Sequence, residues 1–90
     1  MKGVNRIRSL VRGESYTLTL HVLHKLQRLD LSILDLEGIV LQGRAVERQR
    51  DDEHRGWKYL FEGRVRGDAF AVVVRCQRRD MLIFVTIYAL

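Results

Sequence analysis

Residues 69–88 have the sequence A-F-A-V-V-V-R-C-Q-R-R-D-M-L-I-F-V-T-I-Y, and this stretch decides the fold. Two runs rich in valine, isoleucine and phenylalanine flank the polar segment Q-R-R-D at 77–80. Such runs are typical of strands, and a short polar connection between them predicts a hairpin. Because both runs are apolar at almost every position, we expect central strands of a sheet that is covered at least partly on both faces.

The sequence leaves open what covers the second face of this sheet. Self-association through that face would bury its apolar side chains. A sheet that curls and covers itself would do the same without a partner.

The segments before the hairpin extend the sheet toward the N-terminus. W-K-Y-L-F-E-G-R-V at 57–65 places Trp57, Tyr59 and Phe61 on one face, and we interpret Trp57 and Phe61 as core residues. R-G-D-A at 66–69 predicts a tight turn. R-A-V-E-R-Q-R at 44–50 suits an edge strand, since charges discourage edge-to-edge pairing. D-D-E-H-R-G, which follows it, is a polar loop.

The first half of the chain has helical periodicity instead. Val4, Ile7, Leu10 and Val11 lie on one helical face, and Gly13 is placed to end that helix. The segment S-Y-T-L-T follows and favours a brief extended conformation. A second helix begins after Thr19, which is a suitable N-cap, and buries a stripe of Val22, Leu26 and Leu29.

A third helix is predicted from Ser32 to Gly43. Ser32 and Asp35 have the spacing of a capping box, and Ile33, Leu36 and Val40 lie on one face. Helices followed by a meander predict an α+β two-layer sandwich, in which two or three N-terminal helices pack on an antiparallel sheet of about four strands. The 90 residues form a single domain in this interpretation.

Composition narrows the functional classes. The formal net charge of +5 favours polyanionic partners such as RNA, although an acidic protein would satisfy the same charge. One cysteine excludes an internal disulfide framework, and no apolar run reaches the ~18 residues of a membrane span. We therefore expect a cytoplasmic protein without a membrane partner.

No motif predicts a metal, a cofactor or a nucleophilic enzyme. His21 and His24 have no third ligand at a metal-site spacing, and there is no P-loop, dinucleotide-binding glycine pattern or nucleophile elbow. Cys76 alternates with apolar residues, so we interpret it as a thiol of the core or its rim.

The stretch L-T-L-H-V-L-H-K-L-Q-R at 18–28 is the first candidate site. On a helix, His21, Lys25 and Arg28 share one face, with His24 alongside. Metal-independent RNA cleavage needs an acid, a base and cations, which histidine, lysine and arginine can supply. The alternative is that they are solvated residues, or that His21 packs under the sheet and bonds a backbone group. We interpret His24 as a surface residue.

The charged strand and loop are the second candidate, because cations next to aromatic side chains are typical of single-stranded RNA sites. We expect Arg44, Arg48 and Arg50 to form a row on one face, since they share parity with Val46. Trp57 and Tyr59 interleave aromatic surface, while D-D-E partly neutralises the loop. The cations of this candidate are Arg44, Arg48, Arg50, His54, Arg55 and Lys58.

Two residues of the apolar strands complete the candidate set. Arg75 interrupts an apolar strand, so it must pair with a carboxylate or point into a polar groove. Tyr88 shares parity with Thr86 and Phe84, and it either terminates the core or orients a phosphate and carries a proton.

The order of the segments resembles a widespread family of small bacterial proteins related to the BrnT, MqsR and RelE-type toxins of toxin–antitoxin systems. The resemblance rests on I-R-S-L-V-R-G, Y-T-L-T-L-H-V-L-H-K-L, L-D-L-S, V-L-Q-G, W-K-Y-L-F-E-G-R and I-F-V-T-I-Y. It aligns His21 with the histidine of an H-A-x-x-R-M-like helix motif. Lys25 stands where an arginine is usual, and Leu29 where a second charged residue is common.

The resemblance implies an RNA-binding toxin, an endoribonuclease that acts on mRNA free or on the ribosome, neutralised by an antitoxin. In this hypothesis His21, Arg75 and Tyr88 are catalytic, and the cations that bind RNA are Lys25, Arg28, Arg48, Arg50 and Lys58. The alternative is a non-catalytic protein that self-associates as a homodimer or larger oligomer, carried on a mobile element.

Overall fold

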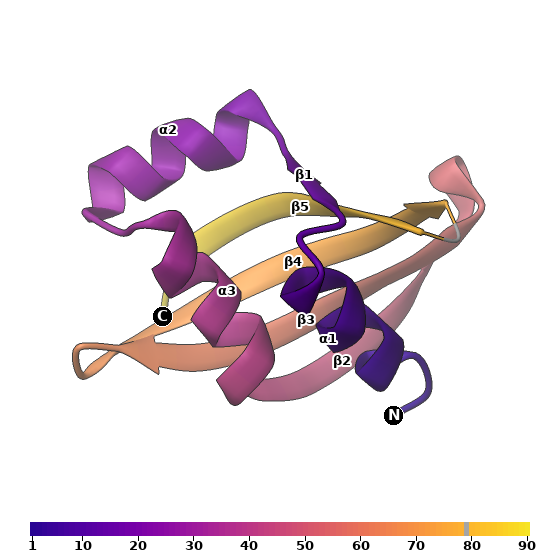
Figure 1. Cartoon of the computed structure of the whole chain (residues 1–90), viewed down its shortest axis with the longest axis horizontal. Helices are drawn as coiled ribbons and strands as arrows, with labels where there is room; N and C mark the ends of the chain where they lie inside the picture. The colour runs from indigo at the N-terminus through magenta and orange to yellow at the C-terminus, as the bar shows by residue number, and fades with distance from the viewer. Residues whose placement is uncertain (79) are drawn as a thin grey trace.

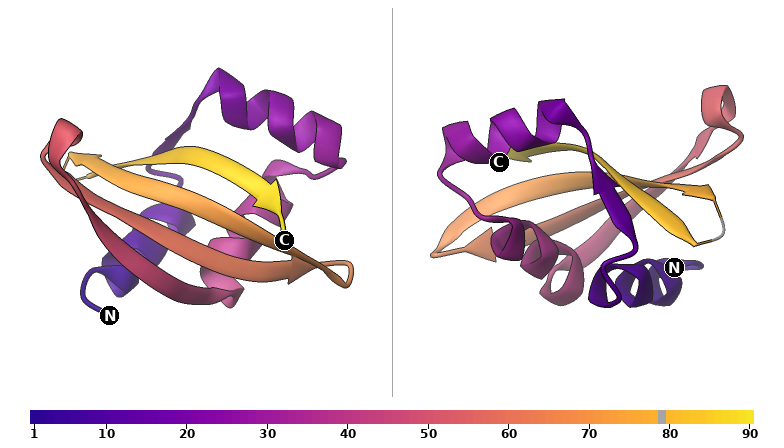
Figure 2. Two further views of the ribbon diagram at one scale, coloured as in Figure 1. Left: turned by 180° about the vertical axis from the view of Figure 1, so that it is seen from behind. Right: turned by 45° about the horizontal axis from the view of Figure 1, so that its top comes forward.

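Three N-terminal helices pack on a sheet, which confirms the predicted α+β fold (Figure 1). The computed structural model describes residues 1–78 and 80–90. Helices α1 and α3 lie across one face of the sheet, α2 projects past the β5 edge, and none of the described helices lies on the opposite face (Figure 2). The elements are α1 (Val4–Arg12), β1 (Tyr16–Leu18), α2 (Leu20–Leu29), α3 (Ile33–Gln42), β2 (Arg44–Asp51), the 3-10 turn η1 (Asp52–His54), β3 (Gly56–Val65), β4 (Asp68–Arg78) and β5 (Met81–Ala89).

The sheet is mixed and has five strands in the order β1-β5-β4-β3-β2. The prediction of about four antiparallel strands was therefore wrong at one edge, where Tyr16 pairs in parallel with Leu82 and Leu18 with Phe84. A three-residue strand is too short to show a period, so its pairing depends on how α1 delivers the chain to β5. The charged strand β2 does form the other edge, as expected.

The predicted helix ends are confirmed. Gly13 ends α1, Thr19 accepts a hydrogen bond from the Val22 amide, and Ser32 and Asp35 form the reciprocal capping box of α3. The R-G-D-A turn joins β3 to β4 through Arg66 and Gly67, both with positive φ. The predicted Q-R-R-D connection includes residue 79, which lies outside the described residues.

The core lies between the helices and one face of the sheet. Phe61, Val72 and Phe84 are fully buried from the sheet side, and Tyr59 is buried beside them. Trp57 and Cys76 are half-buried against this core, as predicted. The helices contribute buried aliphatic side chains, which are Val4, Ile7, Val11, Val22, Leu26, Leu36, Ile39 and Val40.

Two irregularities in the pairing decide which side chains face away from the helices, on what we call the open face. β2 shifts register between Ala45 and Glu47, and β5 shifts between Phe84 and Thr86. An extra residue in a strand reverses the alternation of side chains beyond it. Counting parity along the sequence therefore fails in both strands.

The open face is partly covered by the sheet itself. Ala71 is fully buried, and Leu60 and Val73 are half-buried, within the single chain. One pocket is lined by residues from β2, β3, β4 and β5, which requires a concave sheet. The curled-sheet alternative therefore accounts for part of the coverage without a partner.

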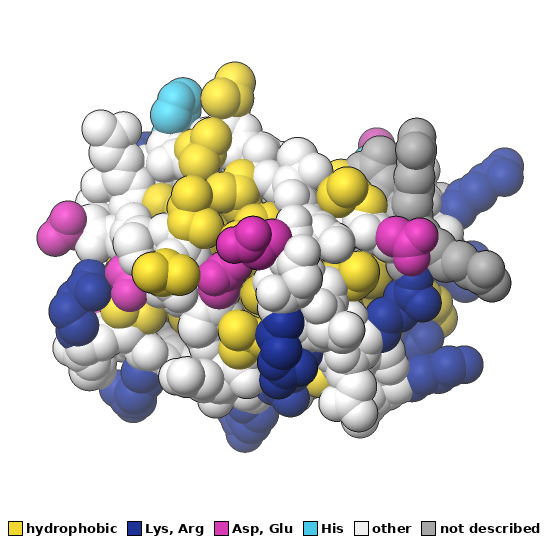
Figure 3. Space-filling view, in the orientation of Figure 1, with side chains coloured by type: hydrophobic (Ala, Val, Ile, Leu, Met, Phe, Trp, Pro, Cys, Tyr) yellow, Lys and Arg dark blue, Asp and Glu magenta, His cyan; other side chains and the backbone are white. Residues whose placement is uncertain are grey.

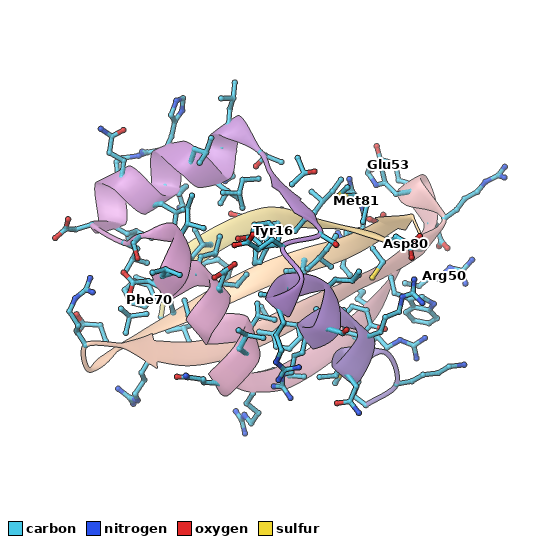
Figure 4. All side chains as sticks on the ribbon, in the orientation of Figure 1. Tyr16, Arg50, Glu53, Phe70, Asp80 and Met81 are labelled. Carbon is cyan, nitrogen blue, oxygen red and sulfur yellow. The ribbon has the colours of Figure 1, made fainter. Side chains whose placement is uncertain are left out.

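A tyrosine with a carboxylate partner joins β1 to α3. The Tyr16 hydroxyl donates a hydrogen bond to Glu37, and its ring packs edge-on against Phe84 with centroids 5.1 Å apart. Figure 4 shows Tyr16 between α3 and the sheet. Burial raises the pKa of Tyr16 to about 12, as do the hydrogen bond to Glu37 and the negative charges of Glu37 and Glu14.

We expect this tyrosine to make folding sensitive to alkaline pH. Its pKa is higher in the folded chain than the ordinary value of about 10, so the unfolded chain ionises first. The contribution of the protonated Tyr16 hydroxyl to folding stability is complete below pH 10 and is lost as the pH rises toward 12. Urea denaturation between pH 8 and 11 should show wild type about 1 kcal/mol more stable than Tyr16→Phe at pH 8, with the difference shrinking as pH rises. A difference that does not change with pH would contradict this expectation.

Candidate active site

A histidine–carboxylate pair lies where β2 turns into β3. Asp51 is the last residue of β2, and His54 ends the single 3-10 turn that follows. His54 Nδ1 lies 3.1 and 3.3 Å from the two Asp51 carboxylate oxygens. Because a carboxylate only accepts, Nδ1 carries the hydrogen of this contact, and in the neutral form of the imidazole Nε2 then keeps its lone pair. The Asp51 side chain is 7% exposed and the His54 side chain is 45% exposed. The imidazole is therefore bound to a buried carboxylate on one side and accessible to solvent on the other.

Arg75 brings a cation beside this pair. Its Nη1 lies 3.8 Å from Asp51 Oδ2 and 3.5 Å from His54 Nδ1, and its side chain is only 15% exposed. Since Nδ1 already donates to Asp51, the approach of Arg75 to His54 is proximity and not a second hydrogen bond. Arg75 Nε is buried without a partner among the described residues.

Lys58 stands directly across from Arg75 in the β3–β4 ladder. Its side chain faces the same side of the sheet, because the adjacent Tyr59 points into the core. Two cations on neighbouring strands repel each other unless an anion lies between them. Asp51 supplies one negative charge, so Asp51, Lys58 and Arg75 together carry a net charge of +1.

The charges around Asp51 keep its carboxyl ionised. Burial raises the pKa of Asp51, but the hydrogen bond from His54 and the positive charges of His54, Lys58 and Arg75 outweigh burial, so its pKa is lowered overall. The carboxylate is therefore available as an acceptor for His54 throughout the neutral range.

A pocket of about 210 Å³ extends from Lys58 across the concave open face to Tyr88. Its lining is mixed, with apolar side chains of β3 and β4 next to polar groups of β2, β3 and β5. The lining residues are Glu47, Gln49, Lys58, Tyr59, Leu60, Val73 and Tyr88. A mixed, concave surface of this kind suits a ligand with apolar faces and charged groups, as a nucleotide has.

A family described as a domain of unknown function, DUF4258, matches residues 18–89. The chain belongs to the DUF4258 family. No curated protein and no solved structure gives a match. The DUF4258 segment holds every side chain of the pocket and of the Asp51–His54–Arg75 cluster, whereas α1 precedes it.

The DUF4258 domain places Arg75, Lys58 and Tyr88 on the open face, but in two groups. Arg75 meets the carboxylate of Asp51, which is one of the two alternatives that the sequence left open for it. Tyr88 pairs with Ala71, four residues from Arg75 on β4, so the two lie roughly 13 Å apart along the sheet. The pocket connects these groups. Phe84 does not share a face with Tyr88, because the irregularity at Val85 lies between them.

His21 reaches the Tyr88 end of the open face. It is exposed, and its Nε2 lies 3.0 Å from the Thr86 hydroxyl. It therefore neither packs under the sheet nor bonds a backbone group. Thr86 and Tyr88 both face the open side, so His21 approaches the pocket from the β5 edge.

The other residues of α2 contribute less. Arg28 and His24 are exposed, the latter as predicted, and Lys25 is half-buried. None of the three makes a side-chain hydrogen bond or ion pair within the described part of the chain.

Arg48 and Arg50 lie on the helix side of the sheet, away from the pocket. Arg48 pairs with Tyr59 and Arg50 with Trp57, whose side chains face the core, whereas Arg44 pairs with Glu62 on the open face. The predicted arginine row was wrong, because the irregularity after Ala45 reverses the faces.

These two arginines instead form a cation–π cluster with one aromatic ring. The Arg48 guanidinium lies 3.7 Å from the Trp57 ring centroid and that of Arg50 5.5 Å from it. Figure 4 labels Arg50 at the end of the molecule that carries Glu53 and η1. Cations and aromatic side chains therefore do lie together in β2 and β3, as predicted. They lie on the helix side of the sheet, whereas Lys58 and Arg75 lie on the open face.

Asp51 was not among the predicted site residues, and His54 was named only as one cation of the charged strand and loop. The sequence placed His54 in a basic loop and treated the acidic D-D-E only as neutralising charge. One feature of the sequence could have predicted this pair. Asp51 and His54 are three residues apart between two predicted strands, and a single tight turn brings side chains at that spacing into contact.

Within residues 1–78 and 80–90, no group of three or more His, Cys, Asp or Glu side chains is arranged to hold a metal ion. None of the described helices has the length and apolar character needed to cross a bilayer.

Proposed function

We propose that this chain is a toxin-like RNA-binding protein that cleaves mRNA without a metal ion and is neutralised by a partner antitoxin. The observation that supports this function is the pairing of Lys58 with Arg75 on a concave sheet face, at the mouth of a pocket that extends to Tyr88. The proposal agrees with the segment order shared with RelE-type toxins.

The chemistry of the open face suits a single RNA strand. Two adjacent cations match a phosphodiester, and the guanidinium of Arg75 presents a planar fork of donors for its oxygens. The pocket between Lys58 and Tyr88 offers the apolar side chains of Leu60 and Val73 with an aromatic ring at its far end. Bases of single strands stack on aromatic side chains, so the pocket is suited to a base next to the bound phosphate.

Cleavage assays with purified protein test this function. Wild type should cleave a single-stranded RNA in the presence of EDTA, leave the matching DNA intact, and arrest growth when its expression is induced. RNA affinity should fall steeply between about 50 and 200 mM salt, as expected for phosphate contacts.

Two double variants separate the site from general charge. Lys58→Ala with Arg75→Ala should abolish cleavage and weaken RNA binding by more than tenfold. Lys2→Ala with Arg12→Ala removes the same charge from exposed positions outside the pocket, and is expected to weaken binding only slightly. Equal effects of the two double variants would contradict a site on the open face.

A non-catalytic role in self-association is the second candidate, and exposed apolar side chains favour it. Leu20, Leu23, Ile33 and Leu34 are exposed on α2 and the start of α3, Leu34 by 77%. Figure 3 shows hydrophobic side chains gathered over α2, apart from the Lys and Arg side chains at the lower edge. Sedimentation should then show a stable oligomer that Leu20→Glu with Leu34→Glu dissociates, and wild type should not cleave RNA.

A further inference from the structure

The strongest unassigned feature is the Asp51–His54 pair beside Arg75. We infer that His54 is the proton-transfer group of an RNA-cleaving centre, that Asp51 positions it, and that Arg75 and Lys58 hold the phosphate of a phosphodiester with a free 2′-hydroxyl. This inference rests on the proposed function and assigns its chemistry to a site at the β2–β3 turn. That site shares only Arg75 with the catalytic residues predicted from the sequence, which were His21, Arg75 and Tyr88.

The geometry leaves the reactive nitrogen of His54 free. Asp51 accepts the Nδ1 hydrogen, which fixes the tautomer and the orientation of the ring. Nε2 has no partner among the described residues, and the side chain is 45% exposed. A general base needs this combination of a fixed ring and an accessible lone pair.

Arg75 places positive charge beside the His54 ring, and Lys58 stands across from Arg75 in the β3–β4 ladder. Arg75 Nη1 lies 3.5 Å from His54 Nδ1, so an anion bound to the guanidinium lies within reach of the imidazole. Arg75 is largely buried, and only 15% of its side chain is exposed, so its position is fixed before a ligand binds. Fixed donors stabilise the charge that develops on phosphorus better than mobile surface cations.

His21 has a different environment. Its Nε2 already contacts the Thr86 hydroxyl, and no described carboxylate lies within hydrogen-bonding distance of its ring. Thr86 pairs with Val73 in the middle of the sheet, whereas Arg75 pairs with Ile83 toward its end. His54 therefore has both the orienting carboxylate and the adjacent cation that His21 lacks.

The inferred reaction balances without a co-reactant. His54 Nε2 removes the proton of the 2′-hydroxyl, the 2′-oxygen forms a bond to phosphorus, and the bond from phosphorus to the 5′-oxygen breaks. The leaving 5′-oxygen takes a proton from solvent water, and His54 returns its proton to solvent. The products are a 2′,3′-cyclic phosphate and a 5′-hydroxyl end, and neither oxidant nor reductant is required.

Single-turnover cleavage of an RNA oligonucleotide tests the assignment. His54→Ala is expected to slow cleavage by about 10²–10⁴-fold, the usual contribution of a general acid or base, with unchanged RNA affinity. His24→Ala, which removes an exposed histidine outside the pocket, is the matched control and should cleave like wild type. A substrate with one 2′-deoxynucleotide should bind equally and resist cleavage at that position.

Asp51→Asn separates positioning from a purely structural role at the turn. It is expected to lower kcat at least tenfold with little change in KM, and to change the His54 tautomer seen in nitrogen-15 NMR spectra. A structural role would lower the thermal stability instead and leave kcat of the folded fraction unchanged.

The outcomes distinguish this inference from the proposed function. If wild type cleaves RNA and His54→Ala cleaves as fast, while His21→Ala is inactive, then the inference is overturned and the proposed function stands. If wild type neither binds nor cleaves RNA, both are overturned.

Discussion

Deletion of residues 1–13 is expected to leave the rest of the chain without a stable fold. These residues contain α1, which lies outside the segment matched by DUF4258, yet Val4, Ile7 and Val11 are buried in the one core. Burying an aliphatic side chain contributes about 1.5–3 kcal/mol, so the three contribute roughly 5–9 kcal/mol. Small domains are stable by about 5–15 kcal/mol in total, and the deletion removes most of that margin.

Contacts from polar groups of this segment add to the loss. Arg8 Nε and Nη2 donate to the carbonyl oxygens of Val40 and Gly43 at 2.9 and 2.8 Å, which satisfies the C-terminal end of α3. The Arg8 guanidinium also lies over the Phe61 ring, 5.7 Å from its centroid. The Tyr59 hydroxyl donates to the Lys2 carbonyl at 2.9 Å. The deletion removes Arg8 and Lys2, so the Val40 and Gly43 carbonyl groups and the Tyr59 hydroxyl lose these hydrogen-bond partners.

Circular dichroism and urea denaturation check this expectation. The truncated chain should lose cooperative unfolding, whereas Asn5→Ala with Ser9→Ala, which alters only the exposed side of α1, should unfold like wild type. A truncated chain with a sharp transition near that of wild type would contradict the role assigned to α1.

Gly43→Ala is expected to destabilise the fold by roughly 3 kcal/mol or more. Gly43 lies where α3 ends against β3, and an added Cβ would fall 2.2 Å from the Ile39 carbonyl oxygen and 2.3 Å from that of Glu62. Both contacts are with backbone atoms, so neither can be relieved by a side-chain rotation. The α3 end or the β2–β3 ladder must move, and the Arg8 hydrogen bond to Gly43 is strained with it.

Gly38→Ala is the matched control in the same helix. No atom outside the helix backbone and its neighbours lies within 4 Å of a Cβ added there, and the residue is inside α3. Alanine is favoured over glycine in a helix by about 0.8–1.0 kcal/mol, so we expect this variant to be more stable than wild type. The two variants should therefore shift the urea midpoint in opposite directions. A similar loss from both would indicate that α3 tolerates no added methyl group, and that the close approach at Gly43 is not the cause.

Much of the fold was predictable because its signals are local. Thr19 and Ser32 mark helix starts through side-chain hydrogen bonds to amides three residues further on, Gly43 marks the end of α3, and these predictions are confirmed. The apolar runs at 69–76 and 81–88 predicted adjacent central strands, and they form β4 and β5. β1 could not be predicted as a strand of the sheet, because its pairing with β5 links residues far apart in the chain.

The candidate site was predictable only in part. Arg75 was selected because a cation on an apolar strand needs an explanation, and Lys58 because cations next to aromatic residues are typical of RNA sites. The structure places the two opposite each other. The prediction that Arg48 and Arg50 share a face with Arg44 was wrong, because one extra residue in β2 reverses the alternation and leaves no mark in the sequence. His21 kept its predicted position on α2 but contacts Thr86, and its role remains a prediction.

The sequence by itself determined the helices of this protein, their ends and their apolar faces, and the presence of the central strands, since these depend on residues within a few positions of one another. Only the tertiary structure decided which polar side chains share the open face. That outcome depends on two register shifts and on the turn that brings His54 back to Asp51. Each is a property of paired strands and not of one segment, because a strand's faces are fixed by the ladder on both of its sides.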